Sequence, residues 1–237
     1  MWNGQKVSVV CSTFHEKDSI RKAINDFFAT GVVDEVVVVN NNAEPGTDEE
    51  IKKTKARLVY ESKQGYGWGY RKALKEAKGD IIVMTEFDGT FVAKDINKLL
   101  SYSGDVDVVF GTRTTNTMIL EGANMGLFLK LGNWAVAKLM EVLFNTTHLS
   151  DVGCTMRLIK RKALQKIERQ FTVGGSFFGT EMMLLVISNK VPFVEIPVSY
   201  KARVGESQVT GSFWKSFFLG CRMILLILSY RARSLFR

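Results

Sequence analysis

Two acidic side chains stand one residue apart, directly after an apolar segment of strand type. The segment IIVM spans residues 81–84, and Glu86 and Asp88 follow it, with Thr90 two residues further on. Carboxylates are typical protein ligands of Mg²⁺, which commonly takes one or two of them and completes its octahedron with phosphate oxygens and water. The spacing therefore predicts a divalent-cation site, for Mg²⁺ or Mn²⁺, that holds a phosphorylated substrate. A loop that only needs solvated polar residues is the alternative interpretation.

The segments that must position these acids alternate between strand and helix. The apolar pattern predicts strands at 6–12, 35–40, 56–61, 80–85 and 105–113, and helices at 18–30, 46–55, 70–79 and 93–103. The second half contains a helix within 122–144, a polar segment at 150–161, a helix at 179–190, a strand at 192–203 interrupted by Pro197, and a helix at 213–237. Strand–helix alternation with nearly continuous apolar strands is typical of an α/β protein with a mostly parallel sheet and helices on both faces.

Ligands of such sheets bind beyond the carboxyl ends of the strands, where the acids already lie. The other residues that leave these ends include Thr13, Phe14, Glu16, Asn40, Asn41, Lys63, Gly65 and Arg113. The amides of Asn40 and Asn41 offer a donor and an acceptor each, so they suit a base edge, but they also suit caps and turns. Gly65, with Gly67 and Gly69, is similar to a phosphate-cradling loop, although tight turning and close packing explain these glycines equally well.

The bulk composition limits the class of protein and of partner. A chain of 237 residues fits one large domain, and its net charge of +8 favours an anionic partner. The sequence shows no nucleic-acid-binding motif, so we expect a phosphorylated small molecule or a membrane surface and no nucleic acid. The three cysteines are distant from one another and argue against a disulfide framework or a zinc site. This cysteine usage fits a reducing cytosol, and no signal-peptide pattern is visible at the start.

In order along the chain, these motifs resemble those of the family 2 glycosyltransferases of the GT-A fold, most of all the dolichyl- or polyprenyl-phosphate sugar transferases. The first-strand motif is VSVVCSTFHE (7–16), the Gly-rich segment is KQGYGWGYRKAL (63–74), and the Asp-x-Asp metal motif is EFD (86–88). Two later motifs match Asp151 to Arg157 and Arg203 to Ser207. The departures are Ser12 and His15 in the first motif, Asn40-Asn41 in place of an acidic pair, Glu86 in place of Asp, and Gln208 where mannose synthases have Lys.

The resemblance implies a nucleotide-sugar donor and a role for each matching residue. Asp88 keeps the family's identity and is expected to contact the metal directly, whereas Glu86 is expected to act through water or to tune the site. The resemblance predicts that the donor, the metal or the acceptor is also bound by Thr13, Phe14, Glu16, Asn40, Asn41, Lys63, Gly65, Thr90, Lys130, Arg203 and Ser207. The predicted catalytic residues are Asp88, Arg113, Asp151, Arg157 and Glu181.

The acceptor decides how much acid–base chemistry the enzyme must supply. A hydroxyl acceptor needs a general base, whereas a lipid monophosphate is largely dianionic at neutral pH and needs cations to position it. Arg113, Lys130, Arg157 and Arg203 are such cations, and for each of them a surface salt bridge is the alternative. Asp151 and Glu181 match family positions near the acceptor, where they would orient these arginines, or act as bases if the acceptor is a hydroxyl.

The C-terminal helix at 213–237 carries five cations and no acid. Its longest wholly apolar run, 223–228, is far shorter than the ~20 residues of a spanning helix, so we expect an amphipathic helix in the plane of the membrane interface. Packing on the domain or at a dimer interface is the alternative. The division expected is therefore a catalytic domain at 1–212 and a membrane-interface helix at 213–237.

The sequence as a whole predicts an inverting, metal-dependent transfer of a hexose from a UDP- or GDP-linked donor to a polyprenyl or dolichyl phosphate at the cytoplasmic membrane face. Three alternatives stay open: transfer to a hydroxyl acceptor, binding of a nucleotide sugar without turnover, and nucleotidyl transfer. The substitutions at Asn40, Asn41 and Glu86 leave the base and the sugar unassigned.

Overall fold

The computed structural model describes residues 1–123, 126–205 and 213–235 of the chain. The strands are β1 (Val7–Thr13), β2 (Glu35–Asn40), β3 (Arg57–Tyr60), β4 (Ile81–Met84), β5 (Val108–Thr112), β6 (Arg157–Lys160) and β7 (Phe193–Pro197). The α-helices are α1 (Lys17–Phe28), α2 (Thr47–Lys52), α3 (Tyr66–Glu76), α4 (Ile96–Ser101), α5 (Leu127–Phe144), α6 (Arg161–Ile167), α7 (Phe178–Ser188) and α8 (Phe213–Leu235). Short 3-10 helices include η1 (Ala93–Asp95), η2 (Tyr102–Gly104), η3 (Asn116–Met118) and η4 (Glu168–Gln170).

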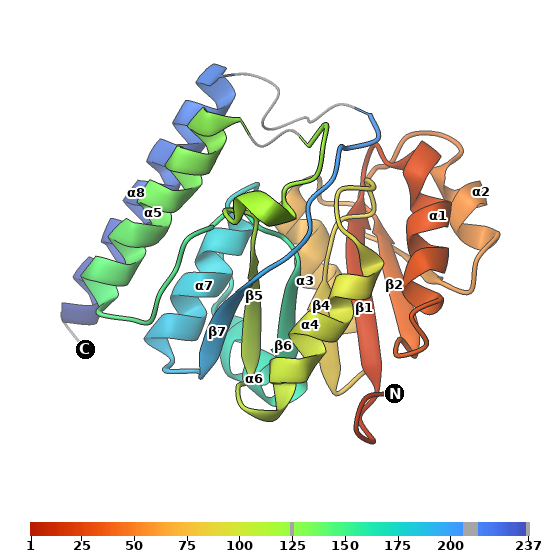
Figure 1. The fold of residues 1–237 in the computed structure, drawn as a ribbon, viewed down its shortest axis with the longest axis horizontal. Helices are drawn as coiled ribbons and strands as arrows, with labels where there is room; N and C mark the ends of the chain where they lie inside the picture. The colour runs from red at the N-terminus through yellow and green to blue at the C-terminus, as the bar shows by residue number, and fades with distance from the viewer. Residues whose placement is uncertain (124–125, 206–212, 236–237) are drawn as a thin grey trace.

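The strands form one mixed sheet in the order β3-β2-β1-β4-β6-β5-β7 (Figure 1). Only β6 is antiparallel to its neighbours β4 and β5, and the other pairs are parallel. The mostly parallel α/β sheet that the sequence predicts is confirmed, but β6 is missing from the prediction because it lies in a segment that reads as polar. As expected from Pro197, β7 is at the edge of the sheet, and it ends at that residue.

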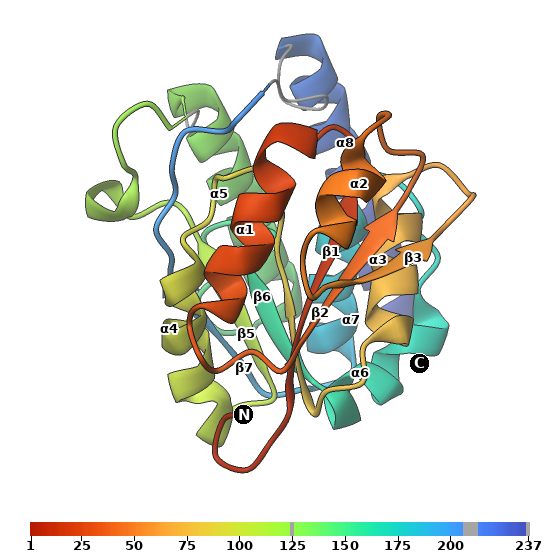
Figure 2. The same cartoon turned by 90° about the vertical axis from the view of Figure 1, so that its right-hand side faces the viewer.

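Helices cover both faces of the sheet, which explains why the strand sequences are apolar at nearly every position. Along β1, Val10 joins the core under α3, α6 and α7, whereas Val9 and Cys11 join the core under α1 and α4. Figure 2 looks at the sheet from the side of β2 and β3 and shows α1 and α4 on its left and α3 and α6 on its right. The carboxyl ends of the parallel strands, together with the first residue of the antiparallel β6, therefore meet at one edge of a rigid two-sided layer.

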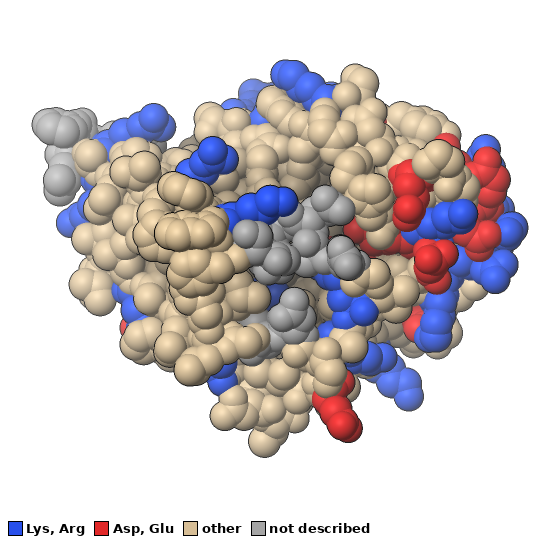
Figure 3. Space-filling model, turned by 90° about the horizontal axis from the view of Figure 1, so that it is seen from above, with Lys and Arg blue, Asp and Glu red and all other residues tan. Residues whose placement is uncertain are grey.

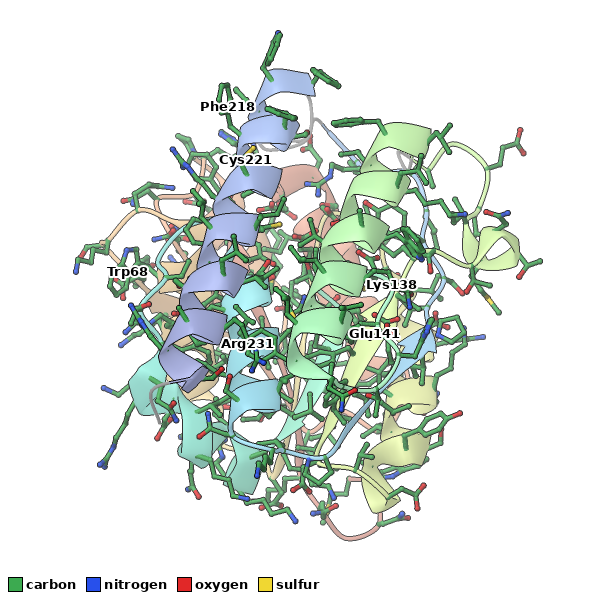
Figure 4. The ribbon with its side chains drawn as sticks, turned by 90° about the vertical axis from the view of Figure 1, so that its left-hand side faces the viewer. Trp68, Lys138, Glu141, Phe218, Cys221 and Arg231 are labelled. Atoms are coloured by element: carbon green, nitrogen blue, oxygen red, sulfur yellow. The ribbon has the colours of Figure 1, made fainter. Side chains whose placement is uncertain are left out.

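Helices α5 and α8 stand side by side beyond the sheet, where α8 packs against both α5 and α7 (Figures 1 and 4). Met223 and Ile227 of α8 are buried in the same core as the helices α6 and α7. The Tyr230 hydroxyl donates a hydrogen bond to Glu181 of α7 at 3.2 Å. One face of the C-terminal helix therefore belongs to the core that it shares with α6 and α7, and the expected boundary at residue 212 lies outside the described residues.

Candidate active site

The predicted convergence of polar residues occurs at the edge where the parallel strands end. The Asn41 N–H donates to the Thr13 carbonyl of β1 at 3.1 Å, and the Thr85 N–H donates to the Val10 carbonyl of the same strand at 3.1 Å. Figure 3 looks onto this edge and shows Lys and Arg side chains near the middle of the face, while the visible Asp and Glu side chains lie mainly on the right. Two groups of buried charges form the centre of this edge.

Asp88 belongs to the first group and is almost completely buried, at 1% exposed. Its Oδ1 accepts hydrogen bonds from the Thr90 backbone N–H at 2.9 Å and from the Thr90 hydroxyl at 2.5 Å. Its Oδ2 accepts no aligned hydrogen bond from the described residues, although the Arg203 guanidinium lies 2.7 Å away. Thr90 therefore orients the carboxylate through one oxygen and leaves the other for a cation, so Thr90 does not need to be a ligand itself.

Glu86 lies beside Asp88 and is held at both of its carboxylate oxygens. Its Oε1 accepts a hydrogen bond from the Thr155 hydroxyl at 3.1 Å, and its Oε2 accepts one from Arg203 Nη2 at 3.3 Å. Burial and then the negative charge of Asp88 raise the pKa of Glu86 to about 7, and Arg203 and Arg113 offset part of this rise. Two like charges this close are unfavourable when both ionise, so the pair either keeps a proton or gains from a cation between the carboxylates.

These donors fit a divalent metal that the substrate helps to hold. Both acids present an oxygen to the same point, because Arg203 Nη2 contacts Asp88 and Glu86 together. Within the described part of the chain, no group of three or more His, Cys, Asp or Glu residues could enclose an ion. Mg²⁺ bound by two carboxylates usually takes its other ligands from phosphate oxygens and water, so this pair suits a metal–diphosphate complex.

The second charged group is the ion pair between Arg113 and Asp151. Arg113 donates from Nε to one carboxylate oxygen at 2.8 Å and from Nη2 to the other at 3.0 Å, and its backbone N–H adds a third bond at 3.0 Å. Burial alone would raise the pKa of Asp151, but the charge and hydrogen bonds of Arg113 outweigh it, so that pKa is lowered. Asp151 therefore orients an arginine, as the resemblance implies, and is poorly suited to accept a proton.

Arg157 begins β6 and is 2% exposed. Its guanidinium donates to the carbonyls of Cys154 at 2.7 Å, Val152 at 2.9 Å and Gly179. The described ion pairs contain no carboxylate partner for it, and burial lowers its pKa. Arg157 therefore ties the loop before β6 to the start of α7 and contributes an uncompensated positive charge there.

A small cavity lies between that loop, α3 and the start of α7, close to Glu86. Its lining residues are Tyr66, Met84, Val152, Gly153, Cys154, Thr155, Arg157, Ser176, Gly179, Thr180 and Met223. The Thr180 hydroxyl is buried without a hydrogen-bond partner among the described residues. The cavity thus combines one cation with four hydroxyl groups, and no carboxylate or imidazole is among its described lining residues.

The remaining acid of the predicted catalytic set, Glu181, does not orient an arginine in the described structure. It is fully buried, and its carboxylate accepts hydrogen bonds from the backbone of Thr172 and Val173 and from the Thr172 hydroxyl, in addition to Tyr230. Glu181 therefore connects α7, the preceding loop and α8.

Two further residues were predicted to bind a ligand. Lys130, on α5, contacts Asn116 of η3. Ser207 lies outside the described residues.

The residues predicted for the nucleotide site are close together, but most of their polar groups already have partners. Glu16 Oε2 accepts hydrogen bonds from the Thr13 hydroxyl at 2.7 Å and the Phe14 N–H at 2.6 Å. Burial raises the pKa of Glu16, and Thr13 and Phe14 counteract this rise. Glu16 therefore shapes the turn after β1 through which the chain enters α1.

The two asparagines that replace the family's acidic pair organise loops. Asn40 donates to Asp48 at 2.6 Å and accepts from the Ala43 N–H at 2.8 Å. Asn41 donates to the Glu61 and Lys63 carbonyls and accepts from the Gly65 N–H at 2.9 Å. These contacts agree with the turn-forming interpretation, and contact of either amide with a base edge stays a prediction.

Close packing explains the glycine-rich segment as well. A Cβ at Gly65 would stand 2.4 Å from the Gly174 carbonyl oxygen, and one at Gly67 would stand 2.7 Å from the Val173 carbonyl oxygen. Gly65 also has a φ of +144°, which disfavours other residues. Lys63 lies 4.0 Å from the ring centre of Trp68, so its ammonium is directed to that indole. These glycines allow α3 to begin at Tyr66, earlier than predicted, against the loop before α7.

Sequence reasoning missed Thr155 and Tyr66, which connect the acids to the cavity. The Thr155 hydroxyl contacts Glu86 at 3.1 Å and the Tyr66 hydroxyl at 3.1 Å. It also missed Glu195 of β7, which accepts hydrogen bonds from the Ser150 hydroxyl at 2.6 Å and the Asp151 N–H at 3.1 Å. Thr155 lies inside the matched segment from Asp151 to Arg157, but its role depends on the antiparallel strand β6, for which the sequence gives little signal.

The comparison with protein families agrees with this geometry. The model of glycosyl transferase family 2 matches residues 8–168, which include all of β1 but its first residue, the acids and the Asp151–Arg157 segment. The chain is a family 2 glycosyltransferase. The glycosyltransferase activity expected from the motifs and the GT-A class of fold are therefore confirmed.

Curated relatives of this glycosyltransferase occur in the archaeon Haloferax volcanii. The low-salt glycan biosynthesis hexosyltransferase Agl6 is 29% identical over 209 residues, which cover 86% of this chain but 49% of that protein. The dolichyl-phosphate hexose transferase of the same organism is 28% identical over 205 residues, which cover 86% of each chain. This chain thus spans about half of the first relative and most of the second.

A solved structure supports the fold. The glucosyl-3-phosphoglycerate synthase of Mycobacterium tuberculosis, in complex with Mn²⁺, UDP-glucose and phosphoglyceric acid, matches with a TM-score of 0.76 and 14% identity. The match covers 97% of this chain and 80% of the synthase. At this identity the likeness concerns the fold alone.

Proposed function

We propose that this glycosyltransferase is an inverting, metal-dependent enzyme that transfers a hexose from a nucleoside-diphosphate sugar to a polyprenyl phosphate. The observation that carries the acceptor is the pair of buried arginines near Glu86, Arg113 and Arg157, beside which the described residues offer no free carboxylate other than Glu86. A phosphate dianion needs no base, whereas a hydroxyl acceptor does. Asp151 is saturated by Arg113, and Glu181 is directed to Thr172 and Val173.

The proposed reaction is a single displacement. An acceptor phosphate oxygen forms a bond to the anomeric carbon as the bond from that carbon to the donor diphosphate breaks, and the configuration inverts. When bound, a divalent cation offsets the charge that develops on the departing diphosphate. Asp88 and Glu86 hold the site for that cation, while Arg113 and Arg157 supply positive charge on the acceptor side. Mn²⁺ in the related fold agrees with this role, and Mg²⁺ fits the same ligands.

An exposed apolar surface on α5 and α8 is evidence for the proposal that the acceptor lies in a membrane. The large apolar side chains that it exposes are Leu127, Phe128, Leu131, Trp134, Phe213, Trp214, Phe217, Phe218, Leu225 and Leu228. The rings of Phe128 and Phe213 lie 4.5 Å apart, so the two helices share this surface at their N-terminal ends. Both N-terminal ends lie at the same end of the molecule as the carboxyl ends of the strands (Figure 1), and Figure 4 shows Phe218 near that end of α8.

The described part of α8 is long and apolar enough to cross a membrane by length and composition, contrary to the expectation from its short uninterrupted apolar run. Its inner face nevertheless packs in the core through Met223 and Ile227, and Tyr230 bonds to Glu181. Both contacts would be lost if the helix left α5 and α7. We therefore favour α8 in the plane of the interface at the cytoplasmic face, with its exposed aromatic residues in the lipid.

The test is an acceptor comparison with purified enzyme, Mn²⁺ and a panel of UDP- and GDP-sugars. A short polyprenyl phosphate should receive the sugar, and the matching polyprenol, which lacks only the phosphate, should not. Asp88→Ala should abolish transfer. Transfer to the polyprenol or to a glycan hydroxyl would overturn the proposed acceptor, binding of a donor without turnover would overturn catalysis, and release of pyrophosphate would indicate a nucleotidyltransferase.

A hydroxyl acceptor remains the second candidate because of Glu86. A half-buried carboxylate with a pKa of about 7 has the basicity of a general base near neutral pH. In that case Glu86 would accept the proton of the acceptor hydroxyl rather than bind a metal. Glu86→Gln distinguishes the two roles, because loss of a base would abolish transfer to hydroxyls at every Mn²⁺ concentration, whereas loss of a metal contact should be partly restored by more Mn²⁺.

A further inference from the structure

One nitrogen of Arg203 lies between the two acids that would bind the metal. Arg203 Nη2 is 2.7 Å from Asp88 Oδ2 and 3.3 Å from Glu86 Oε2. The backbone on both sides of Arg203 is fixed beside the acids, since the Val204 N–H donates to the Asp88 carbonyl at 2.9 Å and the Lys201 N–H donates to the Thr90 carbonyl at 2.8 Å. Arg203 is thus the cation that compensates the two carboxylates in the described structure.

The metal and the guanidinium need the same oxygen. Thr90 occupies Asp88 Oδ1 with two hydrogen bonds, so Oδ2 is the oxygen of Asp88 that remains for a direct metal contact. Mg²⁺ binds oxygen at 2.0–2.1 Å. An ion on Oδ2 at that distance would lie next to Nη2 and bring two like charges into contact. Metal binding and the present position of Arg203 therefore exclude each other.

The Arg203 contact is also easier to exchange than the neighbouring ion pair. Asp88 Oδ2 receives no aligned hydrogen bond from the described residues despite the short distance to Nη2. The Arg203 side chain is 25% exposed, whereas the Arg113 side chain, with its two aligned bonds to Asp151, is 11% exposed. Withdrawal of Arg203 thus breaks a poorly aligned contact near solvent.

We propose that Arg203 is an internal counter-cation that competes with the divalent metal, so that the bare ion binds weakly and enters the site together with the nucleotide diphosphate. The inference rests on the proposed metal site of Glu86 and Asp88. The diphosphate supplies the missing ligands of the ion and, at the same time, offers the displaced guanidinium a new anion. The expected order is therefore a metal–nucleotide complex that binds as one unit.

The test measures Mn²⁺ affinity in the absence of any substrate, by electron paramagnetic resonance of the free ion. Arg203→Gln removes the competing cation and should tighten Mn²⁺ binding about tenfold or more. Lys201→Gln is the matched control, because it removes an exposed cation two residues away that contacts neither acid; its affinity should stay within about twofold of wild type. With UDP present, the difference between Arg203→Gln and wild type should become much smaller.

Arg203→Lys is the second variant, for use if Arg203→Gln does not fold, because it retains a positive charge beside the two acids. It should bind Mn²⁺ about as weakly as wild type. Equal or weaker Mn²⁺ binding by Arg203→Gln than by wild type would overturn the inference, and so would an equal gain in Lys201→Gln, which would indicate a general charge effect. If neither wild type nor Arg203→Gln binds Mn²⁺, with or without UDP, the proposed metal site itself fails.

Discussion

Two groups of charges lie at the same edge of the sheet but are built differently. In one, Arg113 and Asp151 form a bidentate pair in which both partners are nearly or fully buried. In the other, Glu86 and Asp88 share a single arginine, and one carboxylate oxygen of Asp88 receives no aligned hydrogen bond from the described residues. The first group is internally balanced, whereas the second has one more negative charge than its cation compensates once both acids are ionised.

The different charge balance of the two groups indicates different roles at this edge of the sheet. A bidentate ion pair fixes the position of its members, and the guanidinium N–H groups that it does not use stay available for a ligand. An acidic pair with an incomplete partner gains from a divalent cation, since the cation removes like-charge repulsion and fills an open oxygen. The comparison assigns binding of the cation to Glu86 and Asp88, and to Asp151 the rigid positioning of Arg113 toward the acceptor side.

The largest expected effect is on catalysis by Asp88. Asp88→Asn keeps the shape of the side chain and removes its charge, so transfer should fall at least about a hundredfold, because a metal's stabilisation of developing charge is worth several kcal/mol. Its thermal stability should change little, since Glu86 still pairs with Arg203. Steady-state transfer rates and a thermal melt of the metal-free protein measure both effects. Retained activity would place the metal, or the chemistry, elsewhere.

The reverse pattern is expected for Asp151. Asp151→Asn leaves the buried Arg113 without its counter-charge, and breaking a buried pair in this way costs about 3–5 kcal/mol of unfolding free energy. Urea denaturation measures the loss. The double variant Arg113→Met with Asp151→Asn should recover part of it, because no buried charge is then left unpaired. If Asp151→Asn were as stable as wild type, the two groups would not differ as described.

The two groups should also respond to pH with opposite signs. Glu86 has a pKa of about 7, above its ordinary value, so the folded state binds its proton more tightly. Its contribution to the free energy of unfolding therefore falls as pH rises from about 4.5 to 7. The pKa of Asp151 is lowered, so its contribution is present above its ordinary value near 4 and is lost as pH falls below it.

Metal-free urea denaturation between pH 3 and pH 8 tests these signs. Glu86→Gln should remove the decline of stability toward pH 7, and Asp151→Asn should remove part of the loss at the acidic end. A wild-type stability that rises steadily from pH 4.5 to 7, with no change of slope in Glu86→Gln, would contradict the raised pKa of Glu86.

The sequence predicted the parallel strands and the residues that follow them well, because the end of a strand is a local feature of the sequence. Apolar runs identified the parallel strands, and the acids after β4 were therefore placed correctly without a structure. The partners of those acids were harder to predict. Thr155 reaches Glu86 across 69 residues, and Arg203 reaches it across 117. Such contacts depend on the antiparallel β6 and on the backbone pairing of residues 201–204, which no local pattern indicates.

Side-chain roles were predictable only where the residue type allows few alternatives. Asp88 and Arg113 are charged and buried, so each required a partner of opposite charge. Asn40 and Asn41 accept and donate equally well, and only the structure shows that loop backbone and Asp48 occupy their amides. Glu181 matched a family position near the acceptor, but the fold directs its carboxylate toward Thr172 and Tyr230.

The smallest expected effect concerns Glu195, which supports the balanced group from β7. Its carboxylate holds Ser150 and the backbone of Asp151, and burial raises its pKa. Glu195→Gln exchanges one acceptor oxygen for a donor, so stability should fall by about 1 kcal/mol. Because Asp151 positions Arg113, KM for the acceptor should rise a few-fold while kcat changes little.

Glu49→Gln, an exposed acid on α2, serves as the control and should change neither quantity. A fall in kcat without a change in KM would mean that Glu195 acts on the chemical step and not on the position of Arg113. A loss of stability as large as that of Asp151→Asn would show that the hydrogen bonds from Glu195 of β7 are as important as the ion pair. Glu195, Asp151 and Arg113 would then act as one structural unit.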